Sequence, residues 1–244
     1  MLKIALIGYG QMGHLVDQLA ESQNCRVIAR IDPHLKTSIN KASLLDAEVC
    51  IDFSQPDCLL DNIRKIASLK KNIVVGTTGW FEHLPEVQDL VDSNHTALLY
   101  GSNFSVGMNI FFQIVAYSSS LISGLPEYDV FGLELHHNKK LDSPSGTAKK
   151  LAEIITSQNS RKQKHQFDRV ERRIEPEEFH LASIRAGAIP GTHLIGFDSY
   201  ADTIELKHTA RNREGFALGA LKAAQWIKDK KGLFCFDQIF PDLI

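Results

Sequence analysis

The chain has 244 residues, 43% of them hydrophobic, and a formal net charge of −2 at pH 7. This length and composition allow a sizeable core in one large domain or two modest ones. The near-neutral charge argues against a protein that binds nucleic acid or a polyanionic surface, because such binding needs a clear basic excess.

The N-terminus and the cysteines indicate a cytoplasmic location. The opening run MLKIALIGYG is far too short to span a membrane, and it leads into glycines rather than a signal-cleavage site. The four cysteines form no C-x-x-C pair and no spacing typical of a zinc site. We therefore expect reduced thiols, no metal and no membrane segment, as in a cytosolic protein.

The N-terminal part alternates short runs of β-branched residues with amphipathic segments. Strands are predicted at Lys3–Ile7, Arg26–Ile31, Glu48–Phe53, Asn72–Val75 and Ala97–Tyr100. Helical patterns such as His14–Ser22 and Pro56–Leu69 lie between them. This alternation predicts a parallel sheet covered by helices on both faces.

A glycine-rich loop, GYGQMG at residues 8–13, follows the first predicted strand and opens a helix. This G-x-G-x-x-G pattern, in that context, is typical of dinucleotide binding. Gly8 permits the tight turn, Gly10 lets backbone amides approach a pyrophosphate, and Gly13 lets the helix pack closely on the strand. The amides and the dipole of the helix N-terminus then stabilise the anion.

Asp32 follows the second predicted strand, about twenty residues after the glycines, where an acid bonds a ribose 2′-hydroxyl. A carboxylate there repels a 2′-phosphate and therefore favours NADH. Arg30, His34 and Lys36 are close enough in sequence to soften that repulsion. NADPH remains open for this reason.

Two small polar loops follow the fourth and fifth predicted strands: GTTG at residues 76–79 and GSNFS at residues 101–105. Ligands of open α/β sheets bind outside the carboxyl ends of the strands, so both loops suit contact with ribose and nicotinamide. Ordinary turns use the same residue types, and that alternative stays open.

The second half of the chain has a different pattern. Strand-like runs occur at Asp129–His136, Phe179–Arg185, His193–Phe197 and Asp202–His208, several of them separated only by turn residues. This order favours an antiparallel or mixed sheet. Helices are predicted at Thr147–Ser157 and Arg213–Lys228, and the polar stretch Gln158–Glu178 is predicted to be a solvated loop.

These patterns predict an α/β fold with two domains. Residues 1–105 form a Rossmann dinucleotide-binding domain, and residues 106–212 form an α+β substrate-binding and oligomerisation domain with a mixed or antiparallel sheet. We expect the C-terminal helix, within residues 213–244, to pack back on the first domain.

The stretch ELHHNKKLDSPSGTAKKLAE, residues 134–153, places paired histidines and lysines before a helix. Ser145 is a plausible N-cap, so the amides of Gly146 and Thr147 are expected to face outward and to hold a carboxylate or phosphate. Lys140 adds a full charge to that end of the helix.

Three interpretations of this stretch compete. Capping by Asp142 or Ser145 accounts for the helix start but not for the paired histidines and lysines. A metal site is disfavoured, because His136 and His137 are adjacent on a strand and point to opposite faces. The third interpretation is an anionic-substrate site with histidine as the acid, and a neighbouring lysine keeps that imidazole neutral unless a bound dianion restores the proton.

The same stretch closely resembles the signature of dihydrodipicolinate reductases, E-x-H-H-x-x-K-x-D-x-P-S-G-T-A. Other family patterns follow in order: the glycine fingerprint, IDFS with a following proline, GTTG and NFSVGMN, then I-R-A-G-x-x-x-G-x-H, H-x-A-x-x-R and FA-x-GA-x-x-AA-x-W. The resemblance covers nearly the whole chain. Two departures are a first loop one residue shorter than in many members, and Tyr-Gly-Ser before Asn-Phe-Ser.

The resemblance implies an enzyme that reduces hydroxy-tetrahydrodipicolinate, or its dehydrated form, with NADH or NADPH on the diaminopimelate route to lysine. His136 resembles the proton donor, and Lys140 resembles a second catalytic or substrate-polarising cation. The implied substrate-binding residues are His137, Ser145, Gly146 and Thr147. The implied cofactor contacts are Gly8, Tyr9, Gly10, Gln11, Met12, Gly13, Asp32, Gly76, Thr77, Thr78, Gly101, Ser102, Asn103 and Phe104. The family is usually tetrameric, which implies a homotetramer.

Two other functions compete with this one. One is another Rossmann dehydrogenase acting on an amino acid or semialdehyde, although no motif comparable to a semialdehyde dehydrogenase cysteine is present. The other is a non-catalytic NAD-binding regulator, which has no need of His136, Lys140 and Pro144–Thr147 together.

Overall fold

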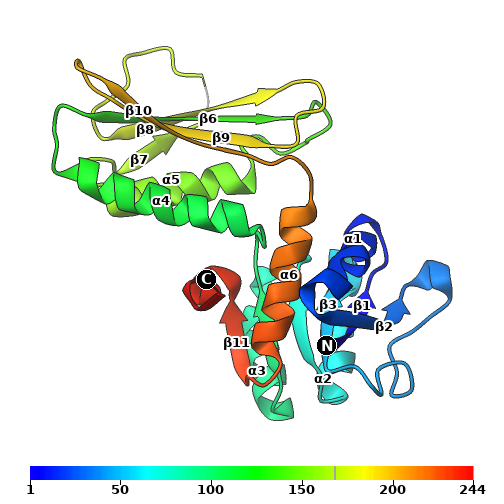
Figure 1. Ribbon diagram of the computed structural model, residues 1–244. Coiled ribbons are helices and arrows are strands. Elements are labelled where there is room, and N and C mark those ends of the chain that lie inside the picture. Colours follow the sequence, from blue (N-terminus) through cyan, green and yellow to red (C-terminus); the bar gives the residue numbers. More distant parts are fainter. Residues whose placement is uncertain (168, 244) are drawn as a thin grey trace. The chain divides into compact units, whose positions relative to one another are not determined.

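The computed structural model describes residues 1–167 and 169–243. The chain divides into two compact units (Figure 1). Unit 1 comprises Met1–Val106 and Arg213–Ile244, and unit 2 comprises Gly107–Asn212. The C-terminal segment therefore rejoins the fold of the N-terminal part.

Unit 1 is built on a six-stranded sheet, sheet A, whose paired strands all run parallel. Its order is β11-β5-β4-β3-β1-β2. The strands are β1 (Leu2–Ile7), β2 (Cys25–Ile31), β3 (Val49–Asp52), β4 (Asn72–Val75), β5 (Ala97–Tyr100) and β11 (Gly232–Cys235). Five of them follow the predicted runs to within two residues at each end, and β11 was not predicted.

Helices cover both faces of sheet A because the side chains of each strand alternate between two cores. On β1, Ile4 and Leu6 belong to one core, and Ala5 and Ile7 belong to the other. The first core contains α1 (Gln11–Ala20) and α6 (Glu214–Ile227), and the second contains α2 (Pro56–Ser68) and α3 (Leu84–Asn94). Short helices η1 (Glu21–Gln23), η2 (Pro33–Leu35), η3 (Phe81–His83), α7 (Phe236–Ile239) and η4 (Phe240–Leu243) complete the unit.

Unit 2 has a five-stranded sheet, sheet B, in the order β10-β9-β6-β8-β7. β6 pairs in parallel with β8 and antiparallel with β9, so the sheet is mixed. The strands are β6 (Asp129–His136), β7 (Lys164–Gln166), β8 (Glu178–Arg185), β9 (Thr192–Asp198) and β10 (Thr203–Thr209). Together with the parallel sheet A, this confirms the predicted α/β fold class.

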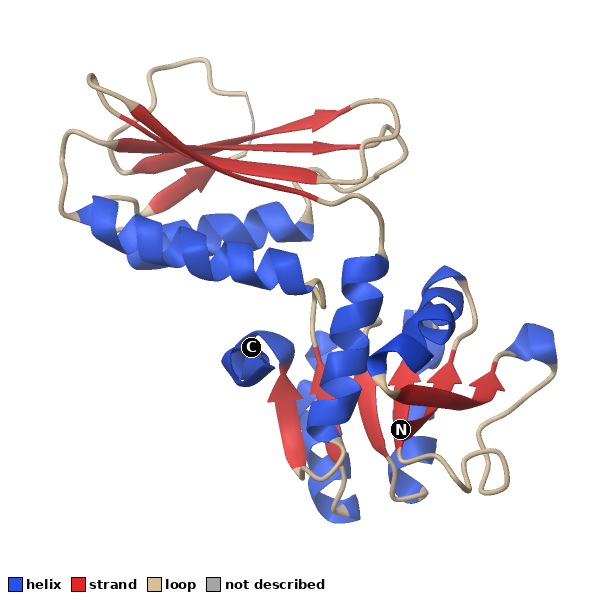
Figure 2. Cartoon of the chain, viewed as in Figure 1, coloured by secondary structure: helices blue, strands red, loops and turns tan. Residues whose placement is uncertain are grey.

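Two long helices, α4 (Val106–Ser123) and α5 (Gly146–Gln158), lie side by side against one face of sheet B (Figures 1 and 2). Their core residues include Phe111 and Val115 of α4 and Leu151 and Ile155 of α5. Among the described residues, one helix, α4, is long and apolar enough to cross a membrane. The residues on one side of α4 belong to this core.

The predicted solvated loop Gln158–Glu178 is wrong in part, because it contains β7 and a buried lysine. Lys162 is 1% exposed. Its ammonium donates to the carbonyls of Pro176 and Glu178, at 2.8 Å each, and lies 2.6 Å from a carboxylate oxygen of Asp129. The polar composition of this stretch predicted solvent exposure, but Lys162 is buried and its ammonium is bound by two carbonyls and a carboxylate.

Candidate functional site

A cavity of about 450 Å³ opens in unit 1 at the carboxyl ends of the strands of sheet A. The predicted cofactor residues Gly10, Gln11, Met12, Gly76, Thr77 and Thr78 line it. Four further lining residues, Phe53, Ser54, Pro56 and Arg213, had no assigned cofactor contact, although IDFS and H-x-A-x-x-R contain three of them. The cavity therefore lies where the loops after β3 and β4 meet the N-terminus of α1.

The glycine loop has the geometry of an anion cradle. Gly8 has φ +82°, and a Cβ there would lie 2.7 Å from the carbonyl oxygen of Phe53. A Cβ on Gly13 would lie 2.5 Å from the carbonyl oxygen of Gly8. Gly10 precedes α1 without a side-chain cap, and the space around its Cα is open. The first-turn amides of α1 thus fit a pyrophosphate.

Asp32 lies directly after β2, with its carboxylate held by two backbone amides. Tyr9 N donates to one oxygen and His34 N donates to the other, each at 2.8 Å. These amides hold the pKa of Asp32 below its ordinary value. The carboxylate is therefore a fixed negative charge beside the glycine loop, which fits a ribose hydroxyl donor.

Asp52, at the end of β3, joins the two loops that line the cavity. Its side chain is fully buried and accepts from Ser54 N at 2.8 Å, Ser54 Oγ at 2.6 Å and Thr77 Oγ1 at 3.3 Å. Asn62 donates to its second oxygen at 3.0 Å. Burial raises the pKa of Asp52 despite these donors. Asp52 therefore sets the positions of Ser54 and Thr77.

The segment Gly101–Phe104 does not line this cavity. Phe104 is 2% exposed and belongs to the core, with its ring centroid 4.6 Å from that of Phe236. Gly101 and Asn103 are also buried, whereas Ser102 is exposed. The structure thus brings the glycine loop and the GTTG loop together and gives Phe104 a packing role.

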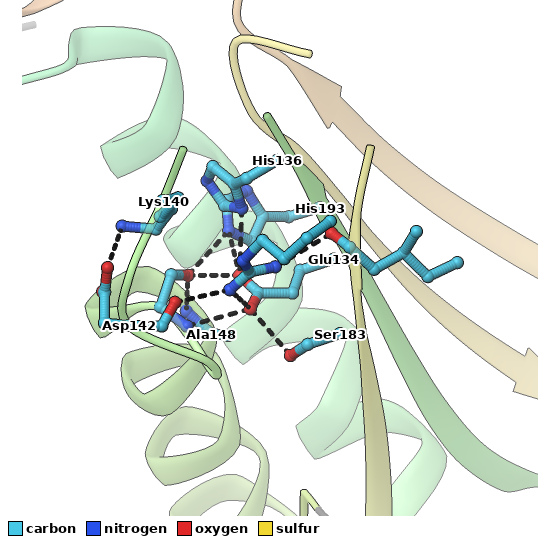
Figure 3. Close-up of polar contacts among 10 residues, drawn as sticks. Glu134, His136, Lys140, Asp142, Ala148, Ser183 and His193 are labelled. Atoms are coloured by element: carbon cyan, nitrogen blue, oxygen red, sulfur yellow. Dashed lines mark hydrogen bonds and ion pairs between the residues drawn. The ribbon is translucent and has the colours of Figure 1, made fainter. Parts of the chain in front are cut away.

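A second polar cluster lies in unit 2, on the face of sheet B that α4 and α5 cover (Figure 3). Glu134 is its centre, with 0% exposure. Glu134 and His136 lie two residues apart on β6 and so share this face. His193 of β9 and Ser183 of β8 both lie opposite Glu134 in the strand register.

Four hydrogen bonds hold the Glu134 carboxylate. One oxygen accepts from Ser145 N at 2.9 Å, Ser183 Oγ at 2.7 Å and Arg185 Nη2 at 2.9 Å. The other oxygen accepts from Ser145 Oγ. Burial alone would raise the pKa of Glu134, but the nearby His193 ring and the donors of Ser145, Arg185 and Ser183 hold it well below its usual range.

His136 lies with Nδ1 3.3 Å from the carboxylate of Glu134, and the Nε2 of His193 lies 3.5 Å from the same oxygen. The two imidazole rings meet edge to face, with centroids 5.2 Å apart. Burial lowers the pKa of His136 to about 4; Glu134 opposes this shift, while His193, Lys140 and Arg185 add to it. The His136 ring is therefore neutral near pH 7.

Lys140 and the start of α5 lie beside this cluster. The Lys140 ammonium donates to a carboxylate oxygen of Asp142 at 2.7 Å (Figure 3). Ser145 is the N-cap of α5, as predicted, and its hydroxyl oxygen accepts from Ala148 N at 3.1 Å. The space around Gly146 is open. His137 lies just beyond β6 and is half-buried.

Sequence reasoning assigned no role to Glu134, His193, Ser183 or Arg185. Because side chains alternate along a strand, the sequence alone could have placed Glu134 and His136 on the same face of β6. Arg185 and His193 belong to the I-R-A-G-x-x-x-G-x-H pattern, but their partners become visible only through the register of three strands.

Glu134, His136 and His193 also form a donor set of metal-ligand type, with one atom from each within 4.8 Å of the others. The electrostatics do not favour a cation there. Glu134 already accepts from Arg185 and from two serines, and Lys140 lies nearby. The cluster is better suited to holding a proton than a metal ion.

Comparison with known proteins gives one consistent family. The chain matches the family models described as "Dihydrodipicolinate reductase, N-terminus" over residues 2–104 and "Dihydrodipicolinate reductase, C-terminus" over residues 107–240. A 4-hydroxy-tetrahydrodipicolinate reductase of Christiangramia forsetii is 36% identical over 242 residues, with 99% of each chain covered. The same enzyme of Staphylococcus carnosus is 35% identical, covering 98% of this chain and 99% of the relative.

A solved structure has the same fold. It is the dipicolinate-bound dihydrodipicolinate reductase from Paenisporosarcina sp. TG-14, which aligns with a TM-score of 0.77 and 22% identity. The alignment covers 98% of this chain and 99% of that one.

Proposed function

Because the chain belongs to the dihydrodipicolinate reductase family, we propose that its unit 1 binds the reduced nicotinamide cofactor and its unit 2 binds the substrate and supplies the proton. The reaction is the NAD(P)H-dependent reduction of 4-hydroxy-tetrahydrodipicolinate to tetrahydrodipicolinate, on the diaminopimelate route to lysine. The observation that carries the division of roles is the buried Glu134–His136 pair beside Lys140.

The proposed cofactor-binding residues are those of the cavity in unit 1. The first-turn amides of α1 after Gly10 would hold the pyrophosphate, and Asp32 would accept from a ribose hydroxyl. Thr77 and Ser54, fixed by Asp52, would line the nicotinamide end. A bound reduced nicotinamide supplies the hydride.

The proposed proton source is His136. The hydride adds to one carbon of the conjugated imine, and a proton must reach the adjacent carbon. His136 is neutral in the free protein because of burial and neighbouring cations. Two substrate carboxylates would add negative charge and raise its pKa, so the ring would gain its proton when substrate binds. Glu134 would stabilise the resulting imidazolium and orient the ring.

The proposed carboxylate-binding groups are Lys140 and the N-terminus of α5 at Gly146 and Thr147. Lys140 would exchange its Asp142 partner for a substrate carboxylate, and the helix N-terminus favours a second anion. His137 is proposed to donate to the substrate from the adjoining loop. Ser145 would act indirectly, because its hydroxyl is already shared by Glu134 and Ala148.

We propose NADH as the preferred cofactor. The supporting observation is the fixed carboxylate of Asp32, whose two amide donors keep it charged. A 2′-phosphate would meet this charge at close range, whereas a 2′-hydroxyl would donate to it.

We also propose a cytoplasmic homotetramer assembled through sheet B. The face opposite α4 and α5 supports this, because it presents apolar side chains to solvent. Phe131 is 38% exposed and Ile184 is 43% exposed there, beside the half-buried Leu133 and Leu194. Sedimentation equilibrium would test the assembly, and a charge at Phe131 should weaken it.

The test of the proposed reaction is steady-state kinetics on the product of dihydrodipicolinate synthase, made fresh, with NADH and NADPH in parallel. Substrate-dependent oxidation of the cofactor is expected, with a higher kcat/KM for NADH. Cofactor binding without turnover would instead support a non-catalytic nucleotide sensor.

A further inference from the structure

An ion pair in unit 1 joins the helix of the glycine loop to the strand that leads to Asp32. Asp17 lies on α1 and Arg30 lies on β2. The guanidinium donates twice, from Nε to Oδ2 at 2.5 Å and from Nη2 to Oδ1 at 2.7 Å. Both carboxylate oxygens are therefore engaged by one arginine, in a bidentate geometry.

Tyr9 of the glycine loop connects this pair to the ribose acceptor. Its hydroxyl donates to Asp17, and the Arg30 guanidinium lies 5.8 Å from its ring centroid. Its backbone amide donates to Asp32 at 2.8 Å. Arg30, near the end of β2, and Asp32, directly after that strand, thus both contact Tyr9.

The pair stays charged in the folded protein. Burial alone would raise the pKa of Asp17, but hydrogen bonds from Arg30 and Tyr9 bring it below its ordinary value. The side chain of Asp17 is 16% exposed and that of Arg30 is 41% exposed. The Arg30 side chain is therefore exposed enough to bind a ligand, but its guanidinium is already hydrogen-bonded to Asp17.

We propose that Asp17 is a determinant of the selectivity for NADH over NADPH, because it holds the Arg30 guanidinium in a bidentate pair and so withholds it from a 2′-phosphate. Arginine is the side chain best suited to bind phosphate with two parallel hydrogen bonds. Selectivity then has two parts: Asp32 repels the 2′-phosphate, and Asp17 keeps Arg30 from compensating for that repulsion. This inference rests on the proposed preference for NADH.

The alternative is that the pair only ties α1 to β2. The two roles differ in what they change. A purely structural tie would weaken the binding of both cofactors together when it is broken, since both use the same glycine loop. A selectivity role would change the ratio of the two dissociation constants.

The experiment measures dissociation constants for NADH and NADPH from cofactor fluorescence, together with kcat/KM for each. In D17N, Kd for NADPH divided by Kd for NADH should fall about tenfold, the effect of one charge-assisted contact. The double variant D17N/R30Q should restore the parental ratio. The matched control is E86Q, which releases Arg64 from an exposed pair at 2.6 Å on the same unit and should leave the ratio unchanged.

An unchanged ratio in D17N would overturn the inference, as would equal weakening of both cofactors. R30Q provides a second test if D17N folds poorly. R30Q leaves the Asp17 carboxylate unpaired and gives NADPH no new cation, so the ratio of the two dissociation constants should not fall, and a fall would overturn the inference. A parent protein that prefers NADPH would contradict the proposed NADH preference instead, and the response of the ratio to D17N would still be measured separately.

Discussion

Glu134 and His136 lie two residues apart on β6, and the Nδ1 atom of His136 is 3.3 Å from the carboxylate of Glu134. The carboxylate is fully buried and bound by serines and an arginine, so its position is fixed before any substrate arrives. The histidine is buried as well, beside cations that disfavour its charged form. His136 should therefore gain its proton only when a negatively charged ligand lies beside it.

Replacing Glu134 with glutamine should impair both stability and turnover. The amide cannot balance the partly buried Arg185 guanidinium, so the free energy of unfolding should fall by about 3 kcal/mol. It also cannot stabilise an imidazolium at His136, so kcat should fall about 10²-fold. Urea denaturation and steady-state kinetics check both values. Wild-type kcat in a folded E134Q protein would contradict the proposed role.

Binding of a dicarboxylate should be accompanied by proton uptake. The pKa of His136 is about 4 in the free protein, and substrate carboxylates should raise it. Between those two pKa values the complex binds more protons than the free protein, so affinity should weaken as pH rises through that window. Calorimetry with dipicolinate in buffers of different ionisation enthalpy measures the uptake. H136Q should remove it, and proton release on binding would contradict this account.

Replacing Lys140 with alanine should lower kcat/KM about 10²-fold, because a cation is lost where negative charge develops. The fold should persist, since among the described residues the ammonium is hydrogen-bonded to Asp142, on a partly exposed turn. The matched variant D142N keeps the cation and removes its partner, so activity should be retained. Near-normal kinetics in K140A would remove Lys140 from the mechanism.

Replacing Asp52 with asparagine should weaken cofactor binding. The amide replaces one of the two carboxylate oxygens with an NH2 group, which then faces the donors of either Ser54 or Asn62. Unfolding free energy should fall by about 2 kcal/mol, and the dissociation constant for NADH should rise about tenfold as the two loops shift. N62A, which removes a single donor, should have a smaller effect on both. Unchanged NADH affinity in D52N would show that the loops are set by other contacts.

Five of the six strands of sheet A could be predicted because each is a short hydrophobic run between turn residues. The helix α4 could not, because its sequence VGMNIFFQIVAYSSSLIS lacks charged residues to mark a solvent face. Half of the candidate site followed from local patterns: the glycine loop, Asp32, and the cap of α5 at Ser145.

The rest of the site depends on strand register. His193 is far from His136 along the chain and lies opposite Glu134 only because β9 pairs antiparallel with β6. Arg185 meets Glu134 because β8 pairs in parallel on the other side of β6. Local periodicity gives no information about which strands are neighbours, so neither contact could be predicted.

The most direct test of the central claim, that His136 supplies the proton, compares kcat with the dissociation constant for NADH in the wild-type protein and in H136Q. We predict that kcat falls about 10²-fold or more, because a general acid is lost, while the dissociation constant for NADH is unchanged. The opposite pattern, with turnover retained and NADH affinity lost, would contradict the assignment of His136 as the proton donor.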